Sequence, residues 1–276
     1  MLDSISEEYA FPTESQPIYD ALGQPINGHI AIVRTDTDEV LGVHGSRYKM
    51  LSNDDVVNSM MDAVKDANIS HDHTLSVEVT EGGRKMRGEI LFNDLVSEPA
   101  VGDIMKFRVS FFNSYDGSRP FGQRADALRL WCLNGCMSPV GMGYTRWKHT
   151  NNVSVDGAAS KMRVSMDTFF NDKALWQNMM AHKIDSVDVE NFFKKTLAKQ
   201  QTVQRLKEKT NERQLENLLN LWHLDKNQLG SNQWALYNAM TYWSSHTEDS
   251  RNPSNTRYIR EGLVSAALQS KHWGAL

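Results

Sequence analysis

FRVSFFNSYDGSRPFGQRADALRLWCLNGCMSPVGM, residues 107–142, is the most informative stretch of this chain. Apolar and polar residues alternate at its start, which predicts a strand, and the Asn-Ser-Tyr-Asp-Gly-Ser run that follows predicts a turn. No nucleophile, base and orienting group are gathered here, so the stretch favours presentation of cations to an anion over catalysis. After the turn we expect a helix and then a second turn at Asn134-Gly135; the helix carries three arginines, Arg119, Arg124 and Arg129.

The segments before this stretch predict two hairpins separated by a helix. HIAIVR and EVLGVH, residues 29–34 and 39–44, are short strands joined by a Thr-Asp-Thr-Asp turn. A helix capped by Ser52 or Asn53 follows, with its apolar residues at helical spacing. Two strands then surround a Gly-Gly turn, residues 74–82 and 84–92, and a third covers residues 104–112.

The whole sequence predicts an α+β fold. We expect an antiparallel sheet with a β-β-β-α core packed by helices, and a helical C-terminal region in which Leu215, Leu218 and Trp222 recur at helical spacing. The expected organisation is a flexible N-terminal arm over residues 1–26, an α+β core over 27–160 and a mainly helical region over 161–276.

Strand alternation predicts a cationic face on the core. If the strands at 84–92 and 104–112 are neighbours, four cations share one side: Lys85, Arg87, Lys106 and Arg108. Such a face can hold a phosphate backbone without reading its sequence. The alternative is the solvated face of a one-sided antiparallel sheet. Further cations of the same region are Arg119, Arg124, Arg129, Arg146 and Lys148.

Aromatic residues lie among these cations, as in sites for single-stranded nucleic acid, where bases stack on rings beside a basic groove. Tyr115 and Trp147 are the candidates, and Trp147, between Arg146 and Lys148, is the best placed. Phe121 is more consistent with a ring that packs a loop against the core. We therefore expect the core to bind single-stranded DNA.

Five segments resemble one protein family. They are RYKMLSN (47–53), NSYDGS (113–118), LWCLNG (130–135), RWKHT (146–150) and WALYNAMTYWSSH (234–246). In this order they are similar to the phage- and plasmid-borne proteins grouped as domain of unknown function 932, over roughly residues 27 to 270. The resemblance implies a bacterial, cytoplasmic setting and no particular function.

The predicted topology, three strands with a cationic face and an arginine-bearing helix, also resembles the core of single-strand annealing proteins of the Redβ, RecT and Rad-fifty-two type. That resemblance is one of pattern, not of motif. It implies an oligomeric ring or filament that holds one DNA strand with its bases exposed, without covalent catalysis and without a cofactor.

The charge distribution is uneven along the chain. Residues 1–83 carry a net charge of −11 and residues 84–163 carry +5, although the whole chain is only −4. Local patches decide nucleic-acid binding more than totals do. An acidic front and a basic middle also favour a head-to-tail contact between copies, the alternative being a monomer whose parts differ in charge.

Other chemistries have weaker support. Two cysteines four residues apart suggest a reducing compartment, and neither an apolar span nor a signal segment is evident, so we expect a cytoplasmic protein without membrane contact. Zinc held by Cys132, Cys136 and His149 would lack a fourth ligand. Two other functions stay open: an interaction protein that occupies a host factor through its acidic first third, and a metal-dependent nuclease. The nuclease would draw on Asp94, Asp103, Asp116 and Asp126.

Overall fold

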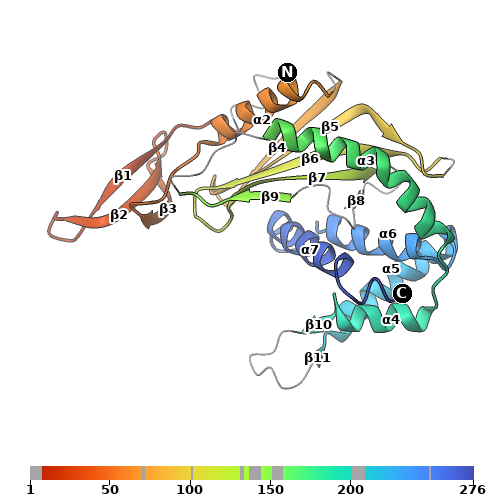
Figure 1. The fold of residues 1–276 in the computed structure, drawn as a ribbon. Helices are drawn as coiled ribbons and strands as arrows, with labels where there is room; N and C mark the ends of the chain where they lie inside the picture. The colour runs from red at the N-terminus through yellow and green to blue at the C-terminus, as the bar shows by residue number, and fades with distance from the viewer. Residues whose placement is uncertain are drawn as a thin grey trace. The chain divides into compact units, whose positions relative to one another are not determined.

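The structure is a computed structural model of the 276-residue chain. It describes residues 8–69, 72–100, 102–130, 134–136, 144–150, 158–200, 209–248 and 250–276. The contacts divide the chain into two units (Figure 1). Unit 1 comprises Met1–Leu95, Arg108–Ala125 and Gly143–Met166, and unit 2 comprises Val96–Phe107, Asp126–Met142 and Asp167–Leu276. Each unit is therefore assembled from separate segments, unlike the consecutive regions expected from the sequence.

The elements follow one another in a mixed order. The strands are β1 (Thr13–Tyr19), β2 (Pro25–Arg34), β3 (Glu39–Gly45), β4 (His73–Thr80), β5 (Lys85–Ser97), β6 (Met105–Ser114), β7 (Phe121–Arg129), β8 (Asn134–Cys136), β9 (Tyr144–Trp147), β10 (Lys199–Gln200) and β11 (Lys209–Thr210). The helices are α2 (Asn53–Ala67), α3 (Ala158–Ala181), α4 (Ser186–Lys195), α5 (Glu212–Leu229), α6 (Gln233–Ser245) and α7 (Pro253–Leu268). An α+β fold with a helical C-terminal region is thus confirmed.

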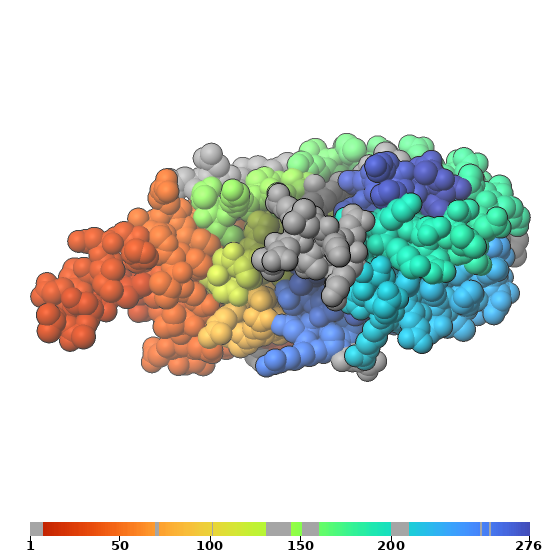
Figure 2. Space-filling view, turned by 90° about the horizontal axis from the view of Figure 1, so that it is seen from below, coloured from red at the N-terminus to blue at the C-terminus, as the bar shows by residue number. Residues whose placement is uncertain are grey.

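Strands β1, β2 and β3 form an antiparallel sheet in that order. The predicted β2–β3 hairpin is confirmed, but the flexible arm is wrong for the described residues from 8 onward, because β1 pairs with β2. Phe11 anchors this strand in a buried cluster with Ile32, Leu41 and Tyr115. The side chains of β1 are mostly exposed and polar, so their sequence pattern does not indicate a strand. Backbone pairing with β2 holds the strand in place. Figure 2 shows the tip of this sheet, in red, projecting beyond the orange surface of the residues that follow.

Helix α2 forms where the sequence predicts it. Ser52 is its N-cap and accepts a hydrogen bond from the backbone of Asp55, and acidic residues occupy the first turn, near the positive end of the helix dipole. Its buried stripe includes Val57 and Met60. At its C-terminus, Arg163 of α3 donates to the carbonyl of Ala67 from Nε at 3.0 Å, which ties the two helices together.

The larger sheet has the order β4-β5-β6-β7-β8, with β9 also paired to β7. The strands β4, β5 and β6 are confirmed, whereas the helix predicted for the three arginines is wrong. Phe121–Arg129 is the strand β7, which pairs antiparallel with β8 at one end and β9 at the other. Together with β6 on its other side, these backbone partners outweigh the helix preference of residues such as Ala125 and Ala127. The core is consequently four successive strands and not β-β-β-α.

The helices of unit 2 pack around α6, which lies against α5, α7 and β8. Aromatic side chains fill this core, with Trp234 stacked 5.3 Å from Tyr237 and Trp176 5.8 Å from Phe169. The predicted packing stripe of α5, formed by Leu215, Leu218 and Trp222, is buried as expected. No helix among the described residues combines the length and apolar character needed to cross a bilayer.

Candidate nucleic-acid interface

The strand cations that were expected to form an open face are largely enclosed. Arg87 on β5 and Arg108 on β6 are 3% and 2% exposed. Both bind the carboxylate of Glu89: Arg87 Nη2 lies 2.6 Å from Oε1 and Arg108 Nη1 lies 3.2 Å from Oε2. The Arg87 guanidinium also lies 5.0 Å from the centroid of the Phe112 ring. This pair of arginines thus neutralises a carboxylate inside the fold, and the prediction of an exposed face is wrong for them.

Lys85 is also buried, and its ammonium group lies 2.7 Å from Glu81 and 3.7 Å from Asp116. Burial raises the pKa of the Asp116 carboxyl, but hydrogen bonds from Ser118 and the charge of Lys85 outweigh it, so the pKa is below its ordinary value. Asp116 is therefore an anionic partner for Lys85. Of the four strand cations, only Lys106 is half-buried rather than buried.

The three arginines predicted on one helix occupy different environments. Arg119 is 2% exposed, and its backbone brackets Ser114, accepting from the hydroxyl at 2.8 Å and donating to it at 3.0 Å. Arg124 is half-buried on β7. Arg129 is buried in unit 2, where its Nε lies 2.5 Å from Asp103 and its Nη1 donates to Asn238 at 3.2 Å. Arg129 therefore has a structural role within unit 2.

The NSYDGS turn is a junction of hydrogen bonds within unit 1. The Asn113 amide donates to the carbonyl of Leu51 at 3.0 Å and to the Asn53 side chain at 2.9 Å. Asn53 in turn donates its backbone N–H to the Tyr115 hydroxyl at 2.8 Å. Tyr115, predicted as a base-stacking ring, is 1% exposed and belongs to the core, so that role is contradicted. Gly117 has φ +69°, as its turn position requires.

Three aromatic rings stack beside this turn. His44 and Tyr48 lie 3.8 Å apart at 9°, and Tyr48 and His149 lie 5.0 Å apart at 21°. The Tyr48 hydroxyl donates to the carbonyl of Ser114, and His44 Nε2 donates to that of Tyr115. Burial raises the pKa of the Tyr48 phenol and lowers the pKa of His149, so both are held neutral.

This stack joins two motif segments whose cations face outward. The backbone N–H of Lys49 donates to the carbonyl of His149 at 3.1 Å, and His149 Nδ1 donates to the carbonyl of Lys49 at 3.3 Å. The flanking side chains on both segments are exposed. They are Arg47, Lys49, Arg146 and Lys148.

Trp147 lies within this group, on the strand β9. Its indole stacks on Phe121 with centroids 5.0 Å apart at 18°, and Lys161 Nζ lies 5.2 Å from the ring centroid. Lys161 is exposed and also donates to Thr145 at 3.2 Å. Trp147 is half-buried, while Phe121 is fully buried, as predicted for a packing ring. We call the surface formed by Arg47, Lys49, Arg146, Trp147, Lys148 and Lys161 the basic edge.

The sheet explains how this surface is displayed. Strand β9 pairs with β7 through Phe121↔Trp147 and Gly122↔Arg146, and it has no other partner strand among the described residues. Arg146 therefore lies on the opposite face from Trp147, and Arg124 shares the face of Arg146. Cations thus lie beside a strand edge that no other described strand covers.

The carboxylates considered for a nuclease are not gathered. Asp103 is paired with Arg129, Asp116 with Lys85, and Asp126 is fully buried. Within the part of the chain that the structure describes, no cluster of three His, Cys, Asp or Glu residues could hold a metal ion. Cys132 of the zinc alternative lies outside the described residues.

Sequence reasoning missed part of the basic edge. Lys49 lies 97 positions before Arg146 and Arg47 lies still earlier, so charge along the chain could not associate them with β9. The available signal was the RYKMLSN segment itself, since it carries two of the four outward cations. Lys161 gave no signal beyond its charge.

Three of the segments that carry the family resemblance lie together in unit 1. The RYKMLSN, NSYDGS and RWKHT segments meet in unit 1 through the bonds of Lys49, Asn53 and Tyr48. Neither the curated proteins nor the solved structures gave a significant match to this chain. A family comparison matches residues 40–262 to Domain of unknown function (DUF932), which covers most of the sequence. The chain therefore belongs to the family described as Domain of unknown function (DUF932).

Proposed function

We propose that this protein binds single-stranded DNA at the basic edge and acts without covalent catalysis. The observation that carries the proposal is the joining of two exposed basic segments, Arg47–Lys49 and Arg146–Lys148, beside a half-buried tryptophan. Neighbouring cations can neutralise successive phosphates, and a ring beside them can stack on a base.

The buried cations have a different part in this proposal. Arg87, Arg108 and Lys85 hold carboxylates inside the fold, so their loss should destabilise the protein without removing phosphate contacts. Binding at the open edge of β9 leaves the bases of a bound strand accessible to a second strand. The function that follows from such binding is strand annealing, as in the recombination proteins that the sequence pattern resembles.

A salt titration tests the proposal. Fluorescence anisotropy would measure affinity for a labelled single-stranded oligonucleotide and its duplex between low and moderate salt. For single strands, log K falls with log salt by about 0.7 per phosphate contact. The variant Arg146→Ala/Lys148→Ala should therefore bind more weakly, with a slope lower by about 1.4. An unchanged affinity and slope in the folded variant would sink the proposal.

Matched controls separate the basic edge from general charge. Lys195→Ala/Lys271→Ala removes two exposed lysines of unit 2 and should leave the slope unchanged. Trp147→Leu should weaken binding by about 1–3 kcal/mol, the cost of one lost base stack, with little change of slope. A melting curve must accompany it, because Trp147 also packs on Phe121.

Assembly belongs to the same proposal. We infer that copies associate head to tail, because the front of the chain is acidic and its middle is basic. Strand β3 is an edge of the three-stranded sheet and offers backbone groups for such a contact. Light scattering with and without single-stranded DNA tests this: a sharp monomer mass in both conditions would exclude a ring or filament.

Two other functions are distinguished by separate assays. If the acidic first third occupies a host factor, a pull-down from host extract should depend on that surface and not on the basic edge. If the protein is a nuclease, oligonucleotides should be cut when a divalent metal is added. Either result without salt-dependent binding of single strands would replace the present proposal.

A further inference from the structure

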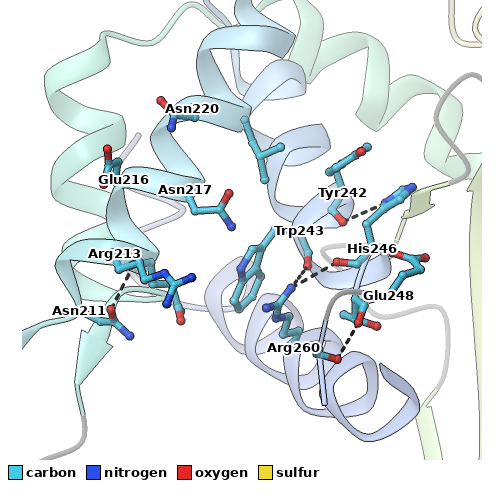
Figure 3. Close-up of a pocket in the computed structure, with 14 residues that line it drawn as sticks. Asn211, Arg213, Glu216, Asn217, Asn220, Tyr242, Trp243, His246, Glu248 and Arg260 are labelled. Carbon is cyan, nitrogen blue, oxygen red and sulfur yellow. Dashed lines mark hydrogen bonds between the residues drawn. The ribbon is translucent and has the colours of Figure 1, made fainter. Parts of the chain in front are cut away.

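Unit 2 contains a cavity of about 730 Å³ that shares no residue with the basic edge (Figure 3). It is lined by α5, by the end of α6 and the loop after it, and by Arg260 of α7. Its volume is within the range of small-molecule sites. All its lining residues belong to unit 2, so the cavity is defined by that unit alone.

Arg260 gives the cavity a fixed positive charge. Its Nη1 donates to the carbonyls of Trp243 at 2.9 Å and His246 at 3.4 Å, and its guanidinium lies 4.7 Å from the centroid of the Trp243 ring. Among the described residues, no carboxylate lies within ion-pair distance of it. Burial lowers the pKa of Arg260, as expected for a cation whose charge is not compensated. The guanidinium thus keeps further N–H donors for an anion.

Arg213 supplies a second cation from the first turn of α5. It is exposed and forms no ion pair with a described carboxylate. Figure 3 shows Arg213, Asn217 and Arg260 arranged around the Trp243 ring. The lining also contains the carboxylates of Glu216 and Glu248, so the two guanidiniums favour a phosphate group by geometry, because their planar donor pairs match its oxygens.

The remaining lining groups suit a planar, hydrogen-bonding ligand. Asn217 and Asn220 make no hydrogen bond with another described side chain, and each amide can both donate and accept. The rings of Tyr242 and His246 stack 3.8 Å apart at 10° and form a flat wall. Glu248 can accept from hydroxyl or amino groups. A small phosphate ester with a heterocyclic base and a sugar would use every one of these groups.

We propose that this cavity binds a nucleoside monophosphate, either free in solution or as the phosphorylated terminal nucleotide of a strand. Arg213 and Arg260 hold the phosphate, and the amides with the Tyr242–His246 wall hold the nucleoside. The proposal goes beyond binding at the basic edge and does not depend on it, since no residue is shared.

Isothermal titration calorimetry with adenosine monophosphate tests the proposal on the full chain. Arg213→Ala should weaken binding about tenfold or more, the loss expected for one charge-assisted contact. Arg251→Ala, an exposed arginine of the α6–α7 loop that does not line the cavity, is the matched control and should bind normally. Asn217→Ala provides a second, uncharged variant with weakened binding.

Further titrations and a competition experiment identify the ligand. Adenosine and inorganic phosphate should each bind more weakly than the monophosphate, because each lacks half of the contacts. Competition in the Arg146→Ala/Lys148→Ala background separates the sources: displacement by a 5′-phosphorylated oligonucleotide identifies a strand end, and its absence identifies a free nucleotide. No binding of the monophosphate at millimolar concentration would overturn the proposal. So would equal affinity for adenosine, or equal weakening by Arg213→Ala and Arg251→Ala.

Discussion

Replacing Asp103 by alanine should destabilise unit 2 strongly. Asp103 and Arg129 are 6% and 4% exposed, and Asp103 accepts from Arg129 Nε at 2.5 Å and from the Trp234 indole at 3.2 Å. The change removes a carboxylate from the buried guanidinium, which keeps its hydrogen bond from Nη1 to Asn238 at 3.2 Å. The variant therefore contains a buried cation that has lost the carboxylate paired with its Nε.

The size of the effect follows from the two lost contacts. Breaking a buried ion pair costs about 3–5 kcal/mol, and the indole hydrogen bond belongs to the same loss. For 276 residues the entropy of unfolding is about 0.6 kcal/mol/K, so a loss of about 4 kcal/mol lowers Tm by about 7 °C. The shift is larger if unit 2 melts by itself. Asp103→Asn keeps an oxygen acceptor and should cost about half as much.

Thermal and urea unfolding, followed by tryptophan fluorescence, would measure these differences. Asp167→Ala removes an exposed carboxylate of α3 and should change stability by no more than about 0.5 kcal/mol. The same logic assigns Arg129 to stability and not to DNA binding, so Arg129→Ala should lower Tm without changing the salt slope. An Asp103→Ala protein that melts with the wild type would refute this reasoning.

Three further predictions concern single positions. Gly117→Val should lower Tm, because φ is +69° and a Cβ would lie 2.9 Å from His44 Cε1; a wild-type melting curve would contradict the turn assignment. Gly88→Ala should cost about 1–3 kcal/mol or more, since its Cβ would overlap the Phe111 ring, and Phe111→Leu should restore part of the loss in a double variant. Burial raises the pKa of Asp225 to about 6 from its ordinary 3.8, with Arg129 opposing the rise. Between pH 3.8 and about 6 the folded state therefore keeps the proton on Asp225 while the unfolded state releases it. The stability that the protonated carboxyl provides is lost as the pH rises through about 6. Asp225→Asn should therefore gain about 1–2 kcal/mol at pH 7.5, allowing for partial solvent exposure, and nothing at pH 4; equal melting of both proteins at pH 7.5 would exclude this account.

Local patterns were sufficient for many elements. The β2–β3 hairpin, α2 and the strands β4 to β6 each combine clear periodicity with a cap or turn residue, such as Ser52 before α2. Those signals lie within a few residues of the element that they specify. The C-terminal helices α5 to α7 are similar cases, with buried stripes at helical spacing.

Strand β7 could not be recognised in the same way. Ala125, Ala127 and Leu128 are good helix formers, and a strand is preferred because β6 on one side and β8 and β9 on the other supply backbone partners. One of these partners, β9, begins at Tyr144, fifteen residues after the end of β7 at Arg129. Non-local pairing of this kind leaves little trace in a short window.

The candidate site was predicted in part. Arg146, Trp147 and Lys148 do lie at an exposed edge, whereas Arg87 and Arg108 are enclosed around a carboxylate. Alternation assigns a residue to a face but does not reveal what covers that face. Glu89, two positions from Arg87 on the same strand, was the available sign that these charges neutralise one another.

The interleaving of the two units has a consequence for how the chain is made. Unit 1 takes its last segment from Gly143–Met166, so its fold cannot be completed until the ribosome has passed that point. Unit 2 includes Val96–Phe107 yet ends at Leu276, so this early segment must wait for the final helices. Domains usually fold in turn during synthesis, each before the next emerges. Here the strand β6 contributes to both units, so it gains its full set of neighbours only after later segments of both units have emerged.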